Sequence, residues 1–236
     1  MKKILLLSLM AITLASCSPT NFDNINRNDV KLIYGNVANY LKGVSNNGNK
    51  PKNIKRKAYV ESDQYTLLQS MTALIKWCEY MYSDESFVYS NEQVVTFNIN
   101  LGSPLKAAIS TNCDTENNKF YTSLAIGTTL DDTNVFFYYF DVDYNFDNNS
   151  ISSFEIRQGG LNIEYANIHY KYQNNIFYEF DPSTDSESEE AISIVEQTAN
   201  IIEEFKSKLT NVIDLDKDYT EYYNNAMVFA FGDSYQ

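Results

Sequence analysis

The chain has 236 residues and a formal net charge of −13, from 31 acidic and 18 basic side chains. This acidic balance argues against nucleic acid as a partner, because phosphate binding requires a basic surface. A single histidine excludes zinc sites built from several histidines. The apolar content of 44% is ample for one hydrophobic core.

The first 17 residues have the anatomy of an export signal. Lys2 and Lys3 precede an apolar run over 4–14, which is shorter than the about 20 residues that a membrane span needs. The run ends in Leu14-Ala15-Ser16-Cys17, which resembles the lipobox of bacterial lipoproteins. The resemblance implies cleavage after Ser16 and a diacylglyceryl group on Cys17. The alternative is an ordinary signal peptide, which would leave Cys17 as a plain thiol.

This signal predicts an extracytoplasmic protein that a lipid anchors to a bacterial membrane. Two acyl chains on Cys17 hold a protein on a bilayer far more firmly than one chain does. We therefore expect a signal peptide over 1–16, a polar tether over 17–28 and a single globular domain over 29–236.

Two helices are predicted at the start of the domain. Val30, Ile33 and Val37 recur at helical spacing, and a second stripe begins near Ser62 and runs to Tyr82. The loop between the two helices is basic and could orient the domain on anionic headgroups, the alternative being a solvated loop. Its candidate membrane-facing residues are Lys50, Lys52, Lys55, Arg56 and Lys57.

From residue 95 the hydrophobic period changes to two, which indicates strands. The strands are predicted over 95–101, 105–111, 119–126, 134–144, 151–157, 161–172 and 176–180. The turns between them, rich in Asn, Asp and Gly, are too short for crossover helices. We therefore expect an α+β fold, in which two N-terminal helices and one long C-terminal helix pack on a curved antiparallel meander of about six to eight strands.

One predicted strand, over 134–146, carries aromatic side chains on both faces. Both faces of this strand must be covered, either by protein or by a bound apolar ligand. The candidate ligand-lining residues are Phe136, Phe137, Tyr138, Tyr139 and Phe140. Helices on one side of a curved sheet resemble, in layout, the half-barrel carriers of the lipoprotein-localisation and mycobacterial lipid-transfer families. That resemblance implies a lipid or another amphiphile as ligand.

The long C-terminal helix is the best-specified element. Ser186 and Glu189 form a capping-box pattern, with Asp185 as the other possible cap, and an apolar stripe runs from Ala191 to Leu209. After residue 214 the pattern weakens, and 227–231 is compatible with a closing strand or a short helix.

Catalytic and metal-binding motifs are sparse. His169 lies in a predicted strand without a nucleophile elbow nearby, so we expect a half-exposed structural histidine. Two series of acidic residues alternate like cation ligands but lack the Gly and Glu of a calcium loop, which favours solvated acidic edges over cation sites. These are Asp141, Asp143, Asn145 and Asp147, and Asp214, Asp216 and Asp218.

Cys78 and Cys113 remain once Cys17 is acylated. Export permits a disulfide between them, but Cys78 lies on an apolar stripe, so a buried free thiol is equally compatible.

Three function classes follow from the sequence. First is a noncatalytic lipoprotein that binds an envelope macromolecule, such as a protein or glycan, without a cofactor. Second is a carrier or sensor of a hydrophobic ligand. Third is an enzyme that uses a pair of acidic residues, which leave no recognisable spacing in a sequence.

Overall fold

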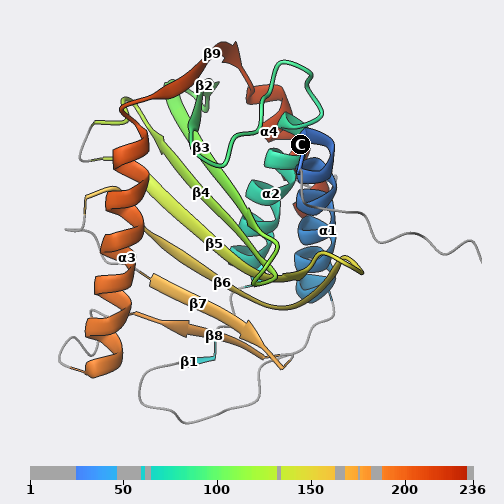
Figure 1. The fold of residues 1–236 in the computed structure, drawn as a ribbon, viewed down its shortest axis with the longest axis vertical. Coiled ribbons are helices and arrows are strands. Elements are labelled where there is room, and N and C mark those ends of the chain that lie inside the picture. Colours follow the sequence, from blue (N-terminus) through green and yellow to red (C-terminus); the bar gives the residue numbers. More distant parts are fainter. Residues whose placement is uncertain are drawn as a thin grey trace, which may run out of the picture.

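A computed structural model describes residues 25–46, 60–61, 65–131, 134–162, 168–174, 176–181 and 188–232. In these ranges one sheet of nine strands has the order β1-β8-β7-β6-β5-β4-β3-β2-β9 (Figure 1). The strands are β1 Val60–Glu61, β2 Val94–Asn100, β3 Pro104–Asp114, β4 Lys119–Gly127, β5 Phe136–Asn145, β6 Ser150–Gly160, β7 Ile168–Gln173, β8 Ile176–Phe180 and β9 Val212–Asp218. The helices are α1 Arg27–Asn46, α2 Tyr65–Met81, α3 Glu189–Lys208 and α4 Thr220–Phe231.

The predicted antiparallel meander is confirmed, because each strand from β2 to β8 pairs antiparallel with the next. Three hairpin turns each contain an asparagine in the left-handed region: Asn118 at φ 53°, Asn149 at φ 57° and Asn174 at φ 55°. Asparagine tolerates this conformation better than most residues do, since its short amide bonds to nearby backbone. The asparagine-rich turns therefore determine where the strands reverse.

Two strand boundaries differ from the prediction. Gly159 and Gly160, expected in a turn, lie in β6 and pair with Phe137 and Phe136. The strand predicted from residue 161 begins instead at Ile168, and Leu161 forms a bend whose amide donates to the carbonyl of Val135. Pairing with the full length of β5 extends β6 through both glycines, although glycine is a weak strand former.

The C-terminal part contains β9, which the sequence pattern did not predict, and α4, in a region where the pattern allowed either a strand or a helix. β9 lies at the sheet edge, parallel to β2, with Val94 opposite Val212. Residues 227–231 belong to α4, so the helical alternative is correct. A parallel pair needs a long crossover connection, and α3 lies in the segment that makes it.

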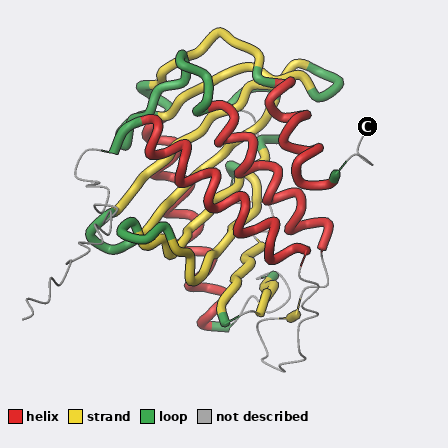
Figure 2. The backbone as a smooth tube through the Cα atoms, turned by 90° about the vertical axis from the view of Figure 1, so that its right-hand side faces the viewer, coloured by secondary structure: helices red, strands yellow, loops and turns green. Residues whose placement is uncertain are grey.

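Helices α1, α2 and α4 cover one face of the sheet, called here the inner face (Figure 2). Val30, Ile33, Val37 and Leu41 of α1 are buried against it, as the helical spacing predicts. Inside this core the hydroxyl of Tyr34 lies 2.6 Å from Thr111 Oγ1 and 2.7 Å from Thr122 Oγ1. These bonds satisfy the polar groups that the core encloses.

Helix α3 covers part of the opposite, outer face, so helices lie on both sides of the sheet (Figure 1). The one-sided layout expected by resemblance to half-barrel carriers is therefore not what this sheet has. The α3 cap also differs from the prediction: the N-cap is Ser188, whose hydroxyl accepts a hydrogen bond from the amide of Ala191 at 3.1 Å. The buried stripe of α3 is Ala191, Ile194, Thr198, Ile202 and Phe205.

Cys78 and Cys113 are both free and buried, so of the two alternatives the buried thiol is the one observed. Burial raises the pKa of both thiols, that of Cys113 to about 12. Among the described helices, none is both long and apolar enough to cross a bilayer.

Candidate ligand-binding cleft

The register of the strands aligns the outer-face side chains in rows that run across the sheet. The rows change from apolar to charged with distance from α3. The row beneath α3 is Ala108, Ala125, Phe137 and Gly159; the second is Ser110, Ser123, Tyr139, Arg157 and His169; the third is Asn112, Tyr121, Asp141, Glu155 and Lys171; the fourth is Asp114, Lys119, Asp143 and Ser153.

The apolar row holds α3 on the sheet. Ala108 and Ala125 are small and fully buried, and they share a cluster with Ile202 and Phe205 of α3. The rings of Phe137 and Phe205 meet edge to face, with their centroids 5.4 Å apart. Small side chains on the strands allow the helix to approach closely, and the aromatic pair adds a large apolar contact.

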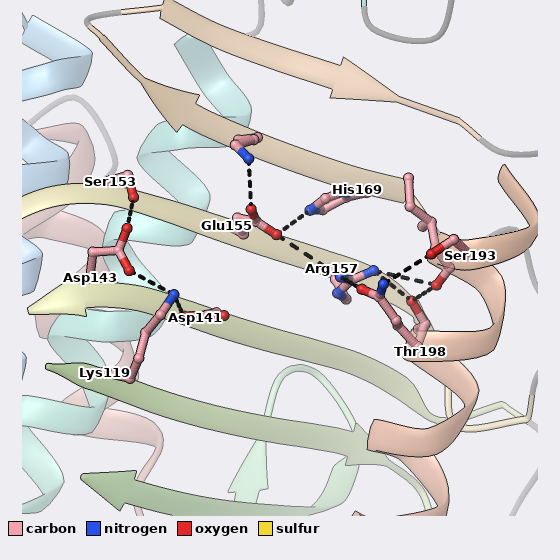
Figure 3. Close-up of polar contacts among 12 residues, drawn as sticks. Lys119, Asp141, Asp143, Ser153, Glu155, Arg157, His169, Ser193 and Thr198 are labelled. Carbon is pink, nitrogen blue, oxygen red and sulfur yellow. Dashed lines mark hydrogen bonds and ion pairs between the residues drawn. The ribbon is translucent and has the colours of Figure 1, made fainter. Parts of the chain in front are cut away.

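Arg157 joins α3 to the second row and is 6% exposed (Figure 3). Its Nη1 donates to Thr198 Oγ1 at 3.1 Å and to the carbonyl of Ile194 at 3.4 Å. Its Nη2 donates to Gln197 Oε1 at 2.9 Å. A buried guanidinium with several acceptors sets the position of the helix above the sheet, because its planar fork restricts their geometry.

A second polar group surrounds Lys119, away from α3 (Figure 3). Lys119 Nζ lies 2.9 Å from Asp141 Oδ1 and 2.6 Å from Asp143 Oδ1. Burial raises the pKa of Asp141 above its ordinary value, in spite of the ion pair with Lys119. Burial acts in the same direction on Asp143, but hydrogen bonds from Lys119 and Ser153 outweigh it and lower the pKa of that carboxyl.

Glu155 is the centre of the third polar group. Its Oε2 lies 2.9 Å from His169 Nε2, and its Oε1 lies 3.1 Å from Lys171 Nζ. Burial opposes ionisation of Glu155, yet His169 and Lys171 lower its pKa to about 2. Burial also lowers the pKa of His169, so its ring is neutral near pH 7 and Nε2 donates to the carboxylate. His169 is 4% exposed, so the expectation of a half-exposed histidine is wrong. The ring lies on β7, between β6 and β8, and its Nε2 is hydrogen-bonded to Glu155.

Between α3 and the second and third rows lies an open cleft of about 440 Å³, a volume within the range of small-molecule sites. The rings of Tyr121 and Tyr139 stack on its sheet side, with centroids 6.1 Å apart and planes 19° apart. The lining side chains from the sheet are Ser110, Asn112, Tyr121, Ser123, Tyr139, Asp141 and Arg157; those from α3 are Gln197, Asn200, Ile201, Glu204, Phe205 and Lys208.

The charged side chains of this cleft are paired with protein groups. Asp141 binds Lys119, Glu204 Oε1 lies 2.8 Å from Lys208 Nζ, and Arg157 bonds to α3. Several neutral side chains differ in this respect. Within the described part of the chain, no hydrogen bond forms to the side-chain polar atoms of Ser110, Asn112, Tyr121, Ser123, Tyr139 or Asn200. The cleft therefore offers neutral donors and acceptors to a ligand, rather than free charge.

The five aromatic residues proposed as ligand-lining do not surround one cavity. Tyr139 lines the cleft, whereas Phe137 is buried beneath α3. Phe140 is buried in the inner core, and Tyr138 packs against that core. Phe136 is 64% exposed. The other predicted positions, Cys17 and the basic loop over 50–57, lie outside the described residues.

A second pocket, of about 320 Å³, lies at the end of the sheet where β5, β6 and β7 meet. Phe136, Val135 and Ile168 give it apolar walls, beside the backbone of Gly159 and Gly160. Gln158 also lines it, and the Oε1 atom of Gln158 is buried without a hydrogen-bond partner among the described residues. The side chains that line this pocket are more apolar than those that line the cleft beneath α3.

The two acidic series form hydrogen bonds with protein groups. Asn145 Oδ1 accepts from the amides of Asp147 and Asn148 in the turn after β5. Asp214 binds Thr96 and Lys106, and Asp218 accepts from the amide of Thr220 at the start of α4. Within the described ranges no three His, Cys, Asp or Glu side chains form a group that could hold a metal ion.

Sequence reasoning missed most of the cleft. Arg157, Asn200, Glu204 and Lys208 were not singled out, although Tyr139 and Asp141 were. Alternation along β3 to β6 could have placed Ser110, Tyr121 and Arg157 on one face. The crossing of α3 over that face has no signal in the local pattern.

Comparison of the chain with protein-family models, with curated proteins and with solved structures finds no match.

Proposed function

We propose that this chain is a lipid-anchored, noncatalytic binding module of the bacterial cell envelope, and that the cleft between α3 and the outer face holds its ligand. The observation that carries the proposal is the open cleft of about 440 Å³, in which six neutral polar side chains have no hydrogen-bond partner among the described residues. Their polar atoms are open to the cleft rather than buried, so they are accessible to a ligand. The sequence Leu14-Ala15-Ser16-Cys17 supports the anchor.

The composition of the cleft favours binding over catalysis. Nucleophilic catalysis by a Ser or Cys needs a base within hydrogen-bond reach of that residue. The lining holds Ser110 and Ser123 but no histidine, and His169 is buried on Glu155. Asp141 and Glu204 both line the cleft, but each is already bound by a lysine. Hydrolysis of a bound ligand by the purified chain would contradict the noncatalytic part of the proposal.

The anchor is tested in cells. Labelled palmitate should enter the wild-type chain and bring it into the membrane fraction, whereas Cys17→Ser should abolish both. Label on the variant, or a wild-type chain that is cut but carries no lipid, would refute the lipoprotein assignment.

Binding is tested with the mature chain, which begins at residue 17 and carries Cys17→Ser for solubility. Envelopes isolated from bacteria that express the chain should retain it in a saturable manner. Asn200→Ala, an exposed change on α3 inside the cleft, should weaken retention. Asn225→Ala, an exposed change on α4, is the matched control and should not. Equal retention of both variants would show that the cleft is not the binding site.

A second candidate function, carriage of a hydrophobic ligand, is favoured by the apolar pocket beside the 64% exposed Phe136. Native mass spectrometry of the mature chain distinguishes it. A stoichiometric lipid that Phe136→Ser removes would support this function, while a clean apo mass would leave the polar cleft as the proposed site.

A further inference from the structure

The pairing of charges in the cleft points to the chemistry of its ligand. This inference rests on the proposed function, because it concerns the same cleft. A site for a phosphate or carboxylate presents cations that no protein carboxylate has neutralised. Here Lys208 is bound by Glu204, and Arg157 Nη2 lies 4.0 Å from the carboxylate oxygen Oε2 of Glu155. The guanidinium of Arg157 also donates to side-chain and backbone oxygens of α3. A cationic ligand would likewise need a carboxylate that no protein cation has neutralised. Asp141 does not meet this requirement, because it forms an ion pair with Lys119.

The groups that remain available are hydroxyls and amides. Ser110 and Ser123 lie opposite each other on β3 and β4, and Asn112 faces Tyr121 in the next row. Asn200 reaches the cleft from α3. Hydroxyls and amides each donate and accept, so this set suits a ligand that is itself dense in hydroxyl groups.

The tyrosine pair adds an apolar surface to the same cleft. Tyr121 and Tyr139 are half-buried, and burial raises the pKa of both hydroxyls, so they remain neutral donors at physiological pH. A tyrosine side chain combines an apolar ring with a polar hydroxyl at its tip. This suits a ligand with one apolar and one polar side. A pyranose ring has this character, because its C–H groups lie on its faces and its hydroxyls on its edge.

We infer that the cleft binds a neutral saccharide, with Tyr121 and Tyr139 as the platform for a sugar ring and with Ser110, Asn112, Ser123 and Asn200 as partners of its hydroxyls. An envelope glycan and a free oligosaccharide share this chemistry. The experiment below separates these two sources.

The mature chain with Cys17→Ser is titrated calorimetrically with neutral chitotriose, cellotriose, maltotriose and mannotriose. Two charged trimers are matched comparators: chitosan trimer, which is cationic, and trigalacturonate, which is anionic. At least one neutral trimer should bind with a Kd on the order of 1 mM or tighter, and the charged trimers should bind more weakly. Tighter binding of a charged trimer, or of uridine or a neutral tripeptide amide, would overturn the inference.

Variants then locate the site. Asn200→Ala should weaken the best trimer about fivefold and Tyr139→Ala about tenfold or more, whereas Tyr178→Ala should leave it unchanged. Tyr178 is a half-buried residue on β8, outside the cleft. Since Tyr139→Ala removes a half-buried ring, Tyr139→Phe, which removes the hydroxyl alone, is measured beside it. Wild-type affinity in Asn200→Ala and Tyr139→Phe would exclude this cleft as the sugar site.

Competition separates the inference from the function on which it rests. Displacement of the chain from isolated envelopes by the best trimer would identify an envelope glycan as ligand. A trimer that binds in the cleft but displaces nothing would identify a free saccharide. The chain could also bind envelopes in a manner that depends on Asn200 and yet bind none of the trimers. That result would refute the saccharide inference and leave the proposed function standing.

Discussion

Phe205 is the main apolar contact between α3 and Phe137 of the sheet, and together with Arg157 it holds the helix over the cleft. Its side chain is 2% exposed, and its ring meets that of Phe137 edge to face in a small cluster under α3. Phe205→Ala removes this contact and leaves a cavity between α3 and the sheet. The second anchor of the helix, Arg157, remains in place.

The expected cost follows from the burial of the ring. Replacing a buried Phe by Ala destabilises a protein by about 3–5 kcal/mol, including about 1 kcal/mol from the aromatic pair. We expect a value near the lower end, about 3 kcal/mol, because a single helix covers this cluster and can partly collapse onto the cavity. Ile192→Ala, on the same helix but 48% exposed, should cost about 0.5 kcal/mol or less.

Urea unfolding of residues 17–236 carrying Cys17→Ser measures both variants. Trp77 is the only tryptophan, fully buried in the inner core, so its fluorescence reports on unfolding without touching α3. Far-ultraviolet circular dichroism follows the helices in the same samples. A loss below about 1 kcal/mol for Phe205→Ala, or a loss equal to that of Ile192→Ala, would refute the assignment of Phe205 as the anchor of α3.

Three further predictions concern other parts of the structure. Ser188→Ala removes the N-cap bond to Ala191 and should cost about 1 kcal/mol, measured by thermal melting; an unchanged Tm would contradict the assigned cap. Glu155→Gln should cost about 2 kcal/mol at pH 7, a discounted value because the side chain is 28% exposed. The pKa of Glu155 is about 2 in the fold, so its contribution is complete above the ordinary carboxyl pKa and is lost as pH falls toward 2. The gap between wild type and Glu155→Gln should therefore narrow from pH 5 downward, and a constant gap would contradict the assigned shift. Cys78 and Cys113 should react with a thiol reagent at pH 8 only after denaturation; rapid reaction of either native thiol would contradict their burial.

Short-range chemistry in the sequence determined the secondary structure of most of the domain. The period of two along residues 95–180 predicted the meander, and Asn118, Asn149 and Asn174 specified its turns through their tolerance of positive φ. The apolar stripe of α3 was also evident, because helical spacing places Ile194, Thr198 and Phe205 on one face. Each of these features depends only on residues that are close together in the chain.

Tertiary structure alone decided the rest. Nothing near Val212 indicates that it will lie beside Val94, because a parallel pairing follows from the path of the intervening chain. The burial of His169 depends on Glu155 of the next strand and on the neighbouring Arg157. The cleft itself joins Ser110 to Asn200, which lie far apart in the sequence. Local periodicity tells which face of a helix is apolar, but not which face of the sheet it covers or which polar side chains are left without partners there.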